Sequence, residues 1–214
     1  MRFVFVRHAE SVANAEERLA GHDDFELTDL GRTQARALHD RLNVEGFRPT
    51  HLYSSPLKRA AETARIVSGS WPLPIVDWDD LMETDIGVFS GLTWDEIRSR
   101  YPDLGPRVEK SRMYDEVPGA ERAAEKRARG RRVVEDVLAR HSNGDTVVLF
   151  THGGILQWIF TALMDSERAW SLGARNTALF DFAIDSEQWR NGDGRDDTSL
   201  WRIERFNDSD HLRV

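Results

Sequence analysis

The chain has 214 residues, of which 40% are hydrophobic, which is enough for one large α/β domain with its own core. Its formal net charge of −8 argues against a nucleic-acid partner, because such a partner requires a basic surface. The sequence has no cysteine, no apolar run approaching ~20 residues and no visible secretory leader, so we expect no disulfide, no membrane association and a cytoplasmic location.

An apolar segment at residues 3–6 leads directly into Arg7 and His8. Its β-branched and aromatic residues predict a strand that is buried on both faces, which is typical of a parallel or mixed α/β sheet. Such sheets bind ligands beyond the carboxyl ends of their strands, and Arg7 and His8 stand at that position. Taken alone, the two residues could equally be a solvated pair that closes the strand.

A polar loop and a long helix should come next. Residues 9–21 are polar and are expected to form a loop over the crevice at the end of the first strand. From about residue 28 to residue 45, apolar side chains recur at helical spacing. Thr28 or Asp29 is the expected N-cap of this helix, because both side chains accept hydrogen bonds from free backbone amides.

A second short strand is expected around residues 52–53, followed by a helix. Ser55 is the expected N-cap of that helix, and Pro56 its first residue. Arg59 would then lie one turn into the helix, near its positive end. Because the preceding strand should end at the same crevice, we favour a phosphate contact for Arg59 over a solvated position.

The middle of the chain is expected to carry an insertion. Residues 74–76 resemble a short strand, and residues 93–101 an amphipathic helix. Several glycines and prolines mark residues at about 84–119 as a loop-rich helical insertion. A charged, mostly exposed helix should then run from about residue 120 to residue 141. Glu121, in its first turn, is explained by the helix dipole.

A later segment repeats the design of the first strand. Residues 146–151 are apolar and lead into His152, Gly153 and Gly154. The glycines let the backbone approach a ligand, and the amides at the start of the expected helix at 155–160 can bind an anion. His8 and His152 can therefore converge on one crevice.

Two late strands are expected at residues 178–184 and 199–206, joined by a hairpin rich in glycine and aspartate at 191–198. No internal repeat and no low-complexity linker is visible in the sequence. One α/β domain therefore accounts for all of the expected elements.

Four groups of residues resemble, in order and spacing, the histidine phosphatase superfamily, in the branch of cofactor-dependent phosphoglycerate mutases and related phosphatases. They are Arg7-His8-Ala9-Glu10, Leu57-Lys58-Arg59-Ala60 with Thr63-Ala64, Glu83 followed by Gly87 and Gly91, and Thr151-His152-Gly153-Gly154. The similarity extends through residues 21–34 and Asn176-Thr177 and so covers most of the chain. It implies a three-layer αβα fold with a mostly parallel central sheet, formed by residues 1–214 as a single domain.

The chemistry of phosphoryl transfer explains the residue types. The reaction requires charge neutralisation and in-line positioning. His8, which follows a strand and an arginine, is the candidate nucleophile that forms a phosphohistidine. Arg7 and Arg59 match phosphate oxygens with their planar guanidinium groups, and His152, expected to be cationic near the phosphate, supplies a further donor. Glu83 is the candidate proton donor to the leaving oxygen, with a solvated loop carboxylate as the alternative.

The resemblance implies the same roles for His8, for the phosphate pocket of Arg7, Arg59 and His152, and for Glu83. The full set of candidate substrate-binding residues is Arg7, Ser11, Asn14, Gly21, Arg59, His152 and Gly153. Two positions depart from the family. Ala9 stands where most members have glycine, which requires that its φ is not positive. Arg122 follows Glu121 where many members have serine.

A metal site is not expected. The chain has seven histidines but no H-x-x-x-H or H-x-H pair. The histidines outside the candidate site are expected on the surface; they are His22, His39, His51, His141 and His211. We therefore expect neither a metal nor a cofactor to take part in the reaction.

The residues that follow Glu83 help to distinguish a phosphatase, a mutase and a non-catalytic binding module. Mutases of the family have a longer insert after the acid–base glutamate, typically beginning Arg-His-Tyr-Gly, whereas Glu83 is followed by residues 84–87, Thr-Asp-Ile-Gly. We therefore predict a phosphatase that hydrolyses a small phosphorylated metabolite through a phosphohistidine on His8. A cofactor-dependent phosphoglycerate mutase is the alternative, and the complete candidate site argues against a non-catalytic binding module. A homodimer is possible, because Trp158 and Trp170 could be core or interface residues.

Overall fold

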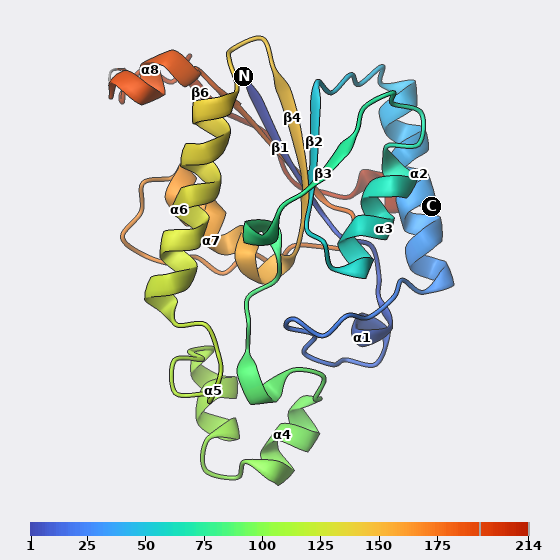
Figure 1. The fold of residues 1–214 in the computed structure, drawn as a ribbon, viewed down its shortest axis with the longest axis vertical. Helices are drawn as coiled ribbons and strands as arrows, with labels where there is room; N and C mark the ends of the chain where they lie inside the picture. Colours follow the sequence, from blue (N-terminus) through green and yellow to red (C-terminus); the bar gives the residue numbers. More distant parts are fainter. Residues whose placement is uncertain (193, 214) are drawn as a thin grey trace.

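The computed structural model describes residues 1–192 and 194–213. A six-stranded sheet with the order β3-β2-β4-β1-β5-β6 forms its centre (Figure 1). The strands are β1 (Arg2–Arg7), β2 (His51–Ser54), β3 (Ile75–Asp77), β4 (Thr146–Thr151), β5 (Leu179–Ile184) and β6 (Trp201–Asp208). β1 to β4 are parallel neighbours, and β5 alone runs in the opposite direction, since it is antiparallel to both β1 and β6. The sheet is therefore mostly parallel, as predicted.

Helices cover both faces of the sheet (Figure 1). On one face, α2 (Asp29–Val44) and α3 (Lys58–Val67) pack against a core that contains Val4 and Val6 of β1. On the other face, α6 (Ala123–Arg140) and α7 (Gly153–Leu163) pack against a core that contains Phe3 and Phe5. Alternate residues of β1 thus pack into two cores, which explains why residues 3–6 of the strand are all apolar. The predicted three-layer αβα fold is confirmed.

The start of the chain differs from the prediction in two places. A four-residue helix, α1 (Val12–Ala15), lies in the expected loop, with Ser11 as its N-cap. The helix α3 begins at Lys58 with Leu57 as its N-cap, and not at Pro56 after Ser55 as predicted. The Ser55 hydroxyl bonds to the His152 ring at 2.8 Å and accepts from the amide of Leu57 at 3.3 Å. The N-cap of α2 is Thr28, one of the two predicted residues, whose hydroxyl accepts from the amide of Gly31 at 2.9 Å.

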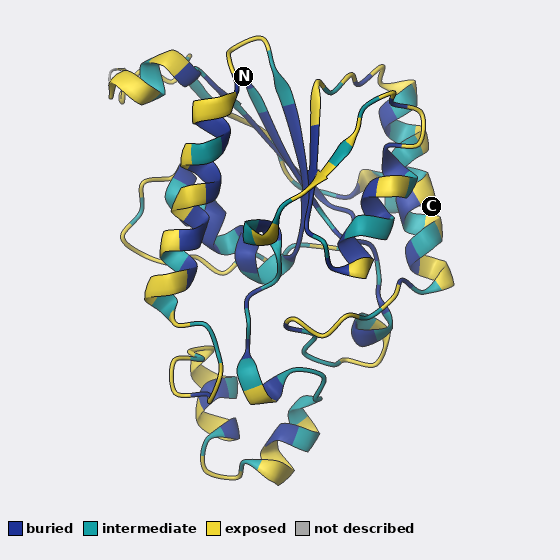
Figure 2. Cartoon of the chain, viewed as in Figure 1, coloured by how far each residue is buried: buried dark blue, intermediate teal, exposed yellow. Residues whose placement is uncertain are grey.

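The segment between β3 and α6 lies beyond the carboxyl ends of the parallel strands (Figure 1). It contains the helices α4 (Trp94–Arg100) and α5 (Gly105–Ser111) and the short 3-10 helices η1 (Asp79–Leu81) and η2 (Gly87–Phe89). The segment has its own small core of Ile86, Phe89, Ile97, Val108 and Val117. The outward faces of its helices are largely exposed (Figure 2).

The end of the chain adds two short helices. α8 (Ser186–Asn191) lies between β5 and β6, where a simple hairpin was expected, and η3 (Asp210–Leu212) follows β6. Within the described residues, no helix has both the length and the apolar character that crossing a membrane requires.

Three further expectations were wrong. Glu121 precedes α6 instead of occupying its first turn, and it forms an ion pair with Arg129 at 2.5 Å. His141, expected on the surface, is buried with 6% of its surface exposed. His39 and His211 are half-buried, and each contacts a neighbouring residue through a ring nitrogen, so that only His22 and His51 are exposed as expected.

Candidate active site

Two histidines meet at the carboxyl ends of the central strands. Arg7 pairs with Thr151 in the parallel β1–β4 ladder, so the residues that follow them, His8 and His152, leave the sheet side by side. Both side chains are buried, and the centroids of their rings are 5.0 Å apart. The sheet register therefore creates the crevice that the sequence pattern indicated.

The hydrogen bonding of His8 shows which of its ring nitrogens carries the proton. Its Nδ1 lies 2.7 Å from the carbonyl oxygen of Ala9. Because a carbonyl oxygen only accepts, Nδ1 must carry the hydrogen, and the lone pair is left on Nε2. Burial lowers the pKa of His8 well below its usual 6.5, and Arg7 and Arg59 lower it further, so the ring is neutral in the free site. Ala9 has no positive φ, which meets the condition for its replacing glycine.

Arg59 holds several groups of the site together. Its guanidinium group is buried and donates to the carbonyl oxygens of Gly21 at 2.9 Å and Asp23 at 2.8 Å. Its Nε also donates to Nδ1 of His152 at 3.2 Å. Two of its five N–H hydrogens remain for a ligand after these three bonds.

The expectation of a cationic His152 does not hold in the free site. Nδ1 of His152 accepts from Arg59, so its proton lies on Nε2, which donates to the Ser55 hydroxyl at 2.8 Å. Burial lowers the pKa of His152 well below 6.5, and the charge of Arg59 lowers it further. His152 is therefore neutral before a phosphate binds.

Arg7 offers a buried donor to the crevice. Its Nη1 donates to the carbonyl oxygen of Ala174, which anchors the side chain. Its Nε is buried and has no hydrogen-bond partner among the described residues. Burial lowers the pKa of Arg7, and Glu83 offsets this by attracting the cation. Because a buried N–H without a partner is costly, Arg7 is a good anchor for an anionic oxygen.

Glu83 lies at the amino end of α7. Its Oε1 accepts from the amides of Thr84 at 2.8 Å and Ile155 at 3.0 Å, and its Oε2 accepts from the amide of Gly154 at 3.1 Å. The first amides of a helix favour a negative group, so the carboxylate is held at the same helix end that carries His152. The crevice thus contains one carboxylate, two arginines and two neutral histidines.

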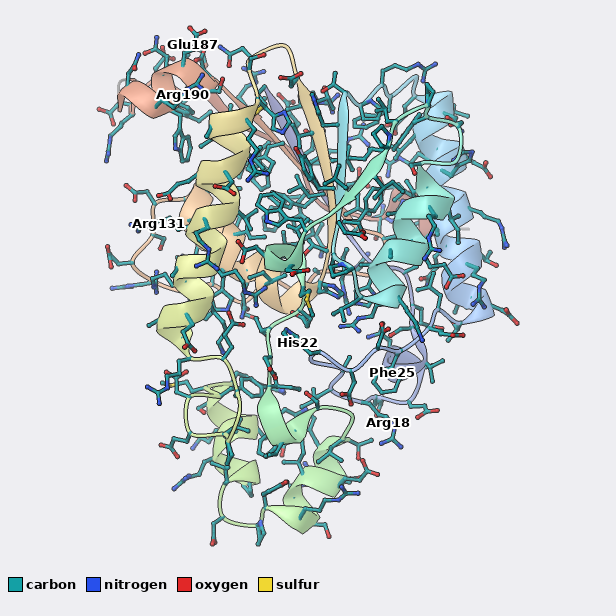
Figure 3. All side chains as sticks on the ribbon, in the orientation of Figure 1. Arg18, His22, Phe25, Arg131, Glu187 and Arg190 are labelled. Carbon is teal, nitrogen blue, oxygen red and sulfur yellow. The ribbon has the colours of Figure 1, made fainter. Side chains whose placement is uncertain are left out.

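Sequence reasoning missed the residues that position Glu83. Arg129 of α6 forms a two-point ion pair with Glu121 and donates to the carbonyl oxygen of Met82 at 2.6 Å. His22 donates through Nε2 to the carbonyl oxygen of Glu83 at 2.7 Å, and Arg129 reaches the same oxygen at 3.4 Å. Figure 3 shows His22 between the sheet and the segment of α4 and α5. The carbonyl oxygens of Met82 and Glu83 are therefore held by Arg129 and His22.

The remaining predicted contacts have structural partners of their own. Asn14 Oδ1 lies near three donors, namely the Ser11 amide and hydroxyl at 3.1 Å each and the Asn176 side chain at 3.3 Å. The Nδ2 group is thus the part of Asn14 that can reach a ligand. Asn176, which was not predicted, also donates to the carbonyl oxygen of His8 at 3.1 Å. Gly21 contributes its carbonyl oxygen to Arg59, and the Cα of Gly153 faces the Arg7 side chain.

A large open depression lies beside the crevice. Its volume is about 900 Å³, and it is lined by residues that include His22, Asp85, Glu121, Arg122 and Arg132. None of the five candidate catalytic side chains lines it. Because five carboxylates and only three arginines line it, the depression is a poor place for a dianionic phosphate, and the reacting group belongs at His8 instead.

Fold and crevice together define a class of phosphoryl-transfer enzymes. The model of the histidine phosphatase superfamily (branch 1) matches residues 3–194, and the chain therefore belongs to this family. The resemblance inferred from the sequence is confirmed.

Similar proteins include phosphatases and a mutase-like protein. The chain is 32% identical to phosphoserine phosphatase 1 of Hydrogenobacter thermophilus over 89% of each chain. It is 30% identical to phosphoglycerate mutase-like protein 4 of Arabidopsis thaliana over 98% of this chain and 86% of that protein. A mycobacterial glucosyl-3-phosphoglycerate phosphatase, solved in complex with VO3, superposes with a TM-score of 0.76 at 29% identity and covers 96% of this chain and 98% of its own. The prediction of a phosphoric monoester hydrolase is confirmed, and a mutase is less well supported.

Proposed function

We propose that Nε2 of His8 attacks the phosphorus of a small phosphomonoester and forms a phosphohistidine. The observation that carries this assignment is the 2.7 Å contact between His8 Nδ1 and the Ala9 carbonyl oxygen, which leaves the Nε2 lone pair free. The same contact keeps Nδ1 protonated after the attack. The phosphorylated ring therefore remains a good leaving group for the second step.

The cationic groups of the crevice support binding and charge stabilisation. Arg7 and Arg59 can each direct N–H groups at the phosphate oxygens, and Asn14 and the Gly153 amide can donate from either side. His152 is neutral in the free site, and a bound dianion would favour its protonated form. No step in this scheme requires a metal ion.

Glu83 completes the proton balance of the proposed reaction. When the dianionic phosphate binds beside it, the Glu83 carboxylate takes up a proton. In the first step, it gives this proton to the leaving oxygen as the P–O bond breaks, and the alcohol departs. In the second step, water attacks the phosphohistidine and gives a proton back to the carboxylate, which releases phosphate and restores neutral His8. The sum of the two steps is hydrolysis of the ester.

The substrate class that we propose is a small phosphomonoester whose alcohol carries a carboxylate. The names of the relatives support it, since phosphoserine and a phosphoglycerate derivative both have this character. The arginines of the segment 84–119 do not identify the carboxylate, because Arg98 and Arg107 are paired with Glu109 and Glu116. A panel of phosphorylated metabolites assayed for released phosphate would test this class.

The leaving-group dependence of two variants tests the proposed roles. An alkyl alkoxide needs a proton to leave, whereas a nitrophenolate does not. Glu83→Gln should therefore lose about 10²–10⁴-fold in kcat/KM on an alkyl phosphate and much less on nitrophenyl phosphate. Arg59→Ala, which removes a phosphate-binding group, should lower kcat/KM by a similar factor on both substrates. Equal losses for Glu83→Gln on the two substrates would contradict the acid role.

The nucleophile and the class of reaction have separate tests. Acid-labile label from a phosphorylated substrate should map to His8, and near wild-type turnover of His8→Ala would contradict this assignment. Incubation of 3-phosphoglycerate with a bisphosphate primer should release phosphate. Rapid formation of 2-phosphoglycerate with little free phosphate would favour the mutase instead.

Several sequence-based expectations stay predictions. We propose that residues 1–214 form a single domain with the insertion at 84–119, and the separate small core of that segment supports the boundaries. The homodimer, the cytoplasmic location and the lack of a nucleic-acid partner also stay predictions. Trp158 is buried, whereas Trp170 is exposed, so light scattering of a Trp170 variant would test the dimer.

A further inference from the structure

A second cluster of titratable side chains lies at the other end of the sheet. His51 is the first residue of β2, His141 is the C-cap of α6, and Asp145 directly precedes β4. One ring nitrogen of each histidine and one carboxylate oxygen of Asp145 lie within 4.8 Å of one another. This cluster is at the amino ends of the strands, opposite α4 and α5 (Figure 1). The six residues of β4 separate it from His152 by about 20 Å, at ~3.3 Å per residue.

His141 is a buried ligand group with an unused nitrogen. Its Nε2 contacts the hydroxyl of Tyr53 at 3.1 Å. Its Nδ1 is buried and has no hydrogen-bond partner among the described residues. Metal-binding histidines commonly donate their other ring N–H to a neighbouring oxygen, and Tyr53 can fill that role for Nε2. Nδ1 would then carry a lone pair, and a bound cation would satisfy this otherwise costly buried atom.

Asp145 is held in place by its neighbours. Its Oδ2 accepts from the amide of Ser142 at 2.8 Å and from the Ser142 hydroxyl at 3.1 Å, and its Oδ1 accepts from Thr50 at 3.2 Å. These bonds orient the carboxylate and leave further lone pairs on both oxygens. His51 Nδ1 lies 3.7 Å from Oδ1 of Asp145, and the centroids of the two histidine rings are 4.3 Å apart.

We propose that His51, His141 and Asp145 bind one divalent transition-metal ion of the zinc type. Two imidazoles and a carboxylate are a ligand set that suits Zn²⁺, with water at the fourth position. Ligand atoms around tetrahedral zinc are roughly 3.3 Å apart, so the observed cluster has to contract slightly. The His51 side chain is 44% exposed and can rotate to do so.

The ion would join parts of the chain that are distant in sequence. It would connect the start of β2, the end of α6 and the start of β4, and would act as a structural clip. The distance from His8 and His152 separates it from the proposed reaction. The proposed ion therefore has a structural role and takes no part in the catalytic steps.

Zinc titration of the full-length chain by calorimetry tests the site. Wild-type protein should bind one Zn²⁺ at this site, and its thermal unfolding midpoint should rise by several degrees at saturation. His51→Ala removes an exposed ligand without opening the core, and its affinity should fall at least about tenfold. Asp145→Asn should also lower the affinity for Zn²⁺. Co²⁺ should give the visible absorption of a tetrahedral site in wild type and lose it in His51→Ala.

Two control variants separate this cluster from other histidines. His39→Gln changes a half-buried histidine outside the cluster and should leave the affinity unchanged. His8→Ala removes the other close histidine pair and should also keep the zinc-induced rise in midpoint. The proposal is overturned if wild type binds no zinc, if His51→Ala binds it as tightly as wild type, or if His8→Ala abolishes the binding. In any of these cases, the cluster is only a packed pair of imidazoles beside a carboxylate.

Discussion

The backbone of Gly154 lies so close to Glu83 that a Cβ at position 154 would stand 2.3 Å from Oε1 of Glu83. No real side chain tolerates that distance, and the absent Cβ is what lets the carboxylate reach the amide of Gly154 at 3.1 Å. At the adjacent Gly153, by contrast, a Cβ would be 3.6 Å from Nε of Arg7, which is an ordinary contact. Two neighbouring glycines therefore serve different purposes.

The first prediction uses the close approach of Gly154 to Glu83. Gly154→Ala should displace the Glu83 carboxylate from the start of α7 and lower kcat on an alkyl phosphate at least about tenfold, which is part of the rate enhancement that a general acid supplies. Gly144→Ala is the control and should leave kcat unchanged, because a Cβ at position 144 would meet no atom within 4 Å. Steady-state kinetics of both variants would check this, and equal effects would show that Glu83 is not held through Gly154.

The second prediction concerns a positioning residue. Arg129→Gln removes the ion pair with Glu121 and the bond to the Met82 carbonyl oxygen, so the segment carrying Glu83 should loosen. The loss in kcat should be larger for an alkyl phosphate than for nitrophenyl phosphate, because it acts through the proton donor. Arg132→Gln is the control, since Arg132 is an exposed arginine on the same helix that pairs with Asp80.

A purely structural role of Arg129 would give a different pattern. A variant that is merely unstable would lose activity on both substrates in proportion, and the thermal midpoint would fall with it. Equal losses on the two phosphates would therefore remove Arg129 from the positioning of Glu83.

The third prediction is a pH dependence of kcat/KM. Attack requires neutral His8, whose pKa is held well below 6.5 by burial and then by Arg7 and Arg59. After correction for ionisation of the substrate, kcat/KM should stay high as the pH falls through 6.5 and decline only at lower pH. In Arg7→Gln, the loss of a nearby cation should raise the pKa of His8, so that the decline of kcat/KM at acid pH begins at a higher pH. An acid limb at or above pH 6.5 in the wild type would contradict a neutral His8.

The fourth prediction concerns stability at acid pH. Burial, followed by the charge of Arg41, lowers the pKa of His211 to about 4, and its Nε2 bonds to the Thr177 hydroxyl at 2.8 Å. The folded pKa is below the usual 6.5, so the unfolded chain binds more protons between pH 6.5 and 4, and stability should fall as the pH drops through this window. NMR titration of His211 would give the pKa directly. His211→Gln should show a shallower loss of stability across the same window.

The sequence predicted the features that depend on apolar patterns. β1 and β4 were predicted because Phe3 to Val6 and their counterparts in β4 are apolar at every position, and only a sheet covered on both faces buries such strands. The approach of His8 and His152 follows from these two strands being parallel neighbours, which the pattern permits but does not require.

The remaining features depend on contacts across the fold. Ser55 carries the local signal of an N-cap, but α3 begins only at Lys58. The Ser55 hydroxyl bonds to the amide of Leu57 and to the ring of His152, which is 97 residues away. Arg129 looked like one of many solvated charges, yet it precedes the buried Val133 by four residues and Val137 by eight, so it lies on the inner face of α6. His141 follows Val137 by four, and the same spacing would have indicated its burial.

The central place of β1 in the sheet also constrains the order of folding during synthesis. Of the six strands of the sheet, β1 is synthesised before the others, but its partners β4 and β5 end at Thr151 and Ile184. The apolar run of β1 must therefore wait, unpaired on both edges, until most of the chain has been made. Such pairings of high contact order are slow, and an exposed strand of this kind is prone to aggregate. We expect newly made chains to depend on chaperones during this interval, and a circular permutant that places β1 directly after β4 should fold with less aggregation.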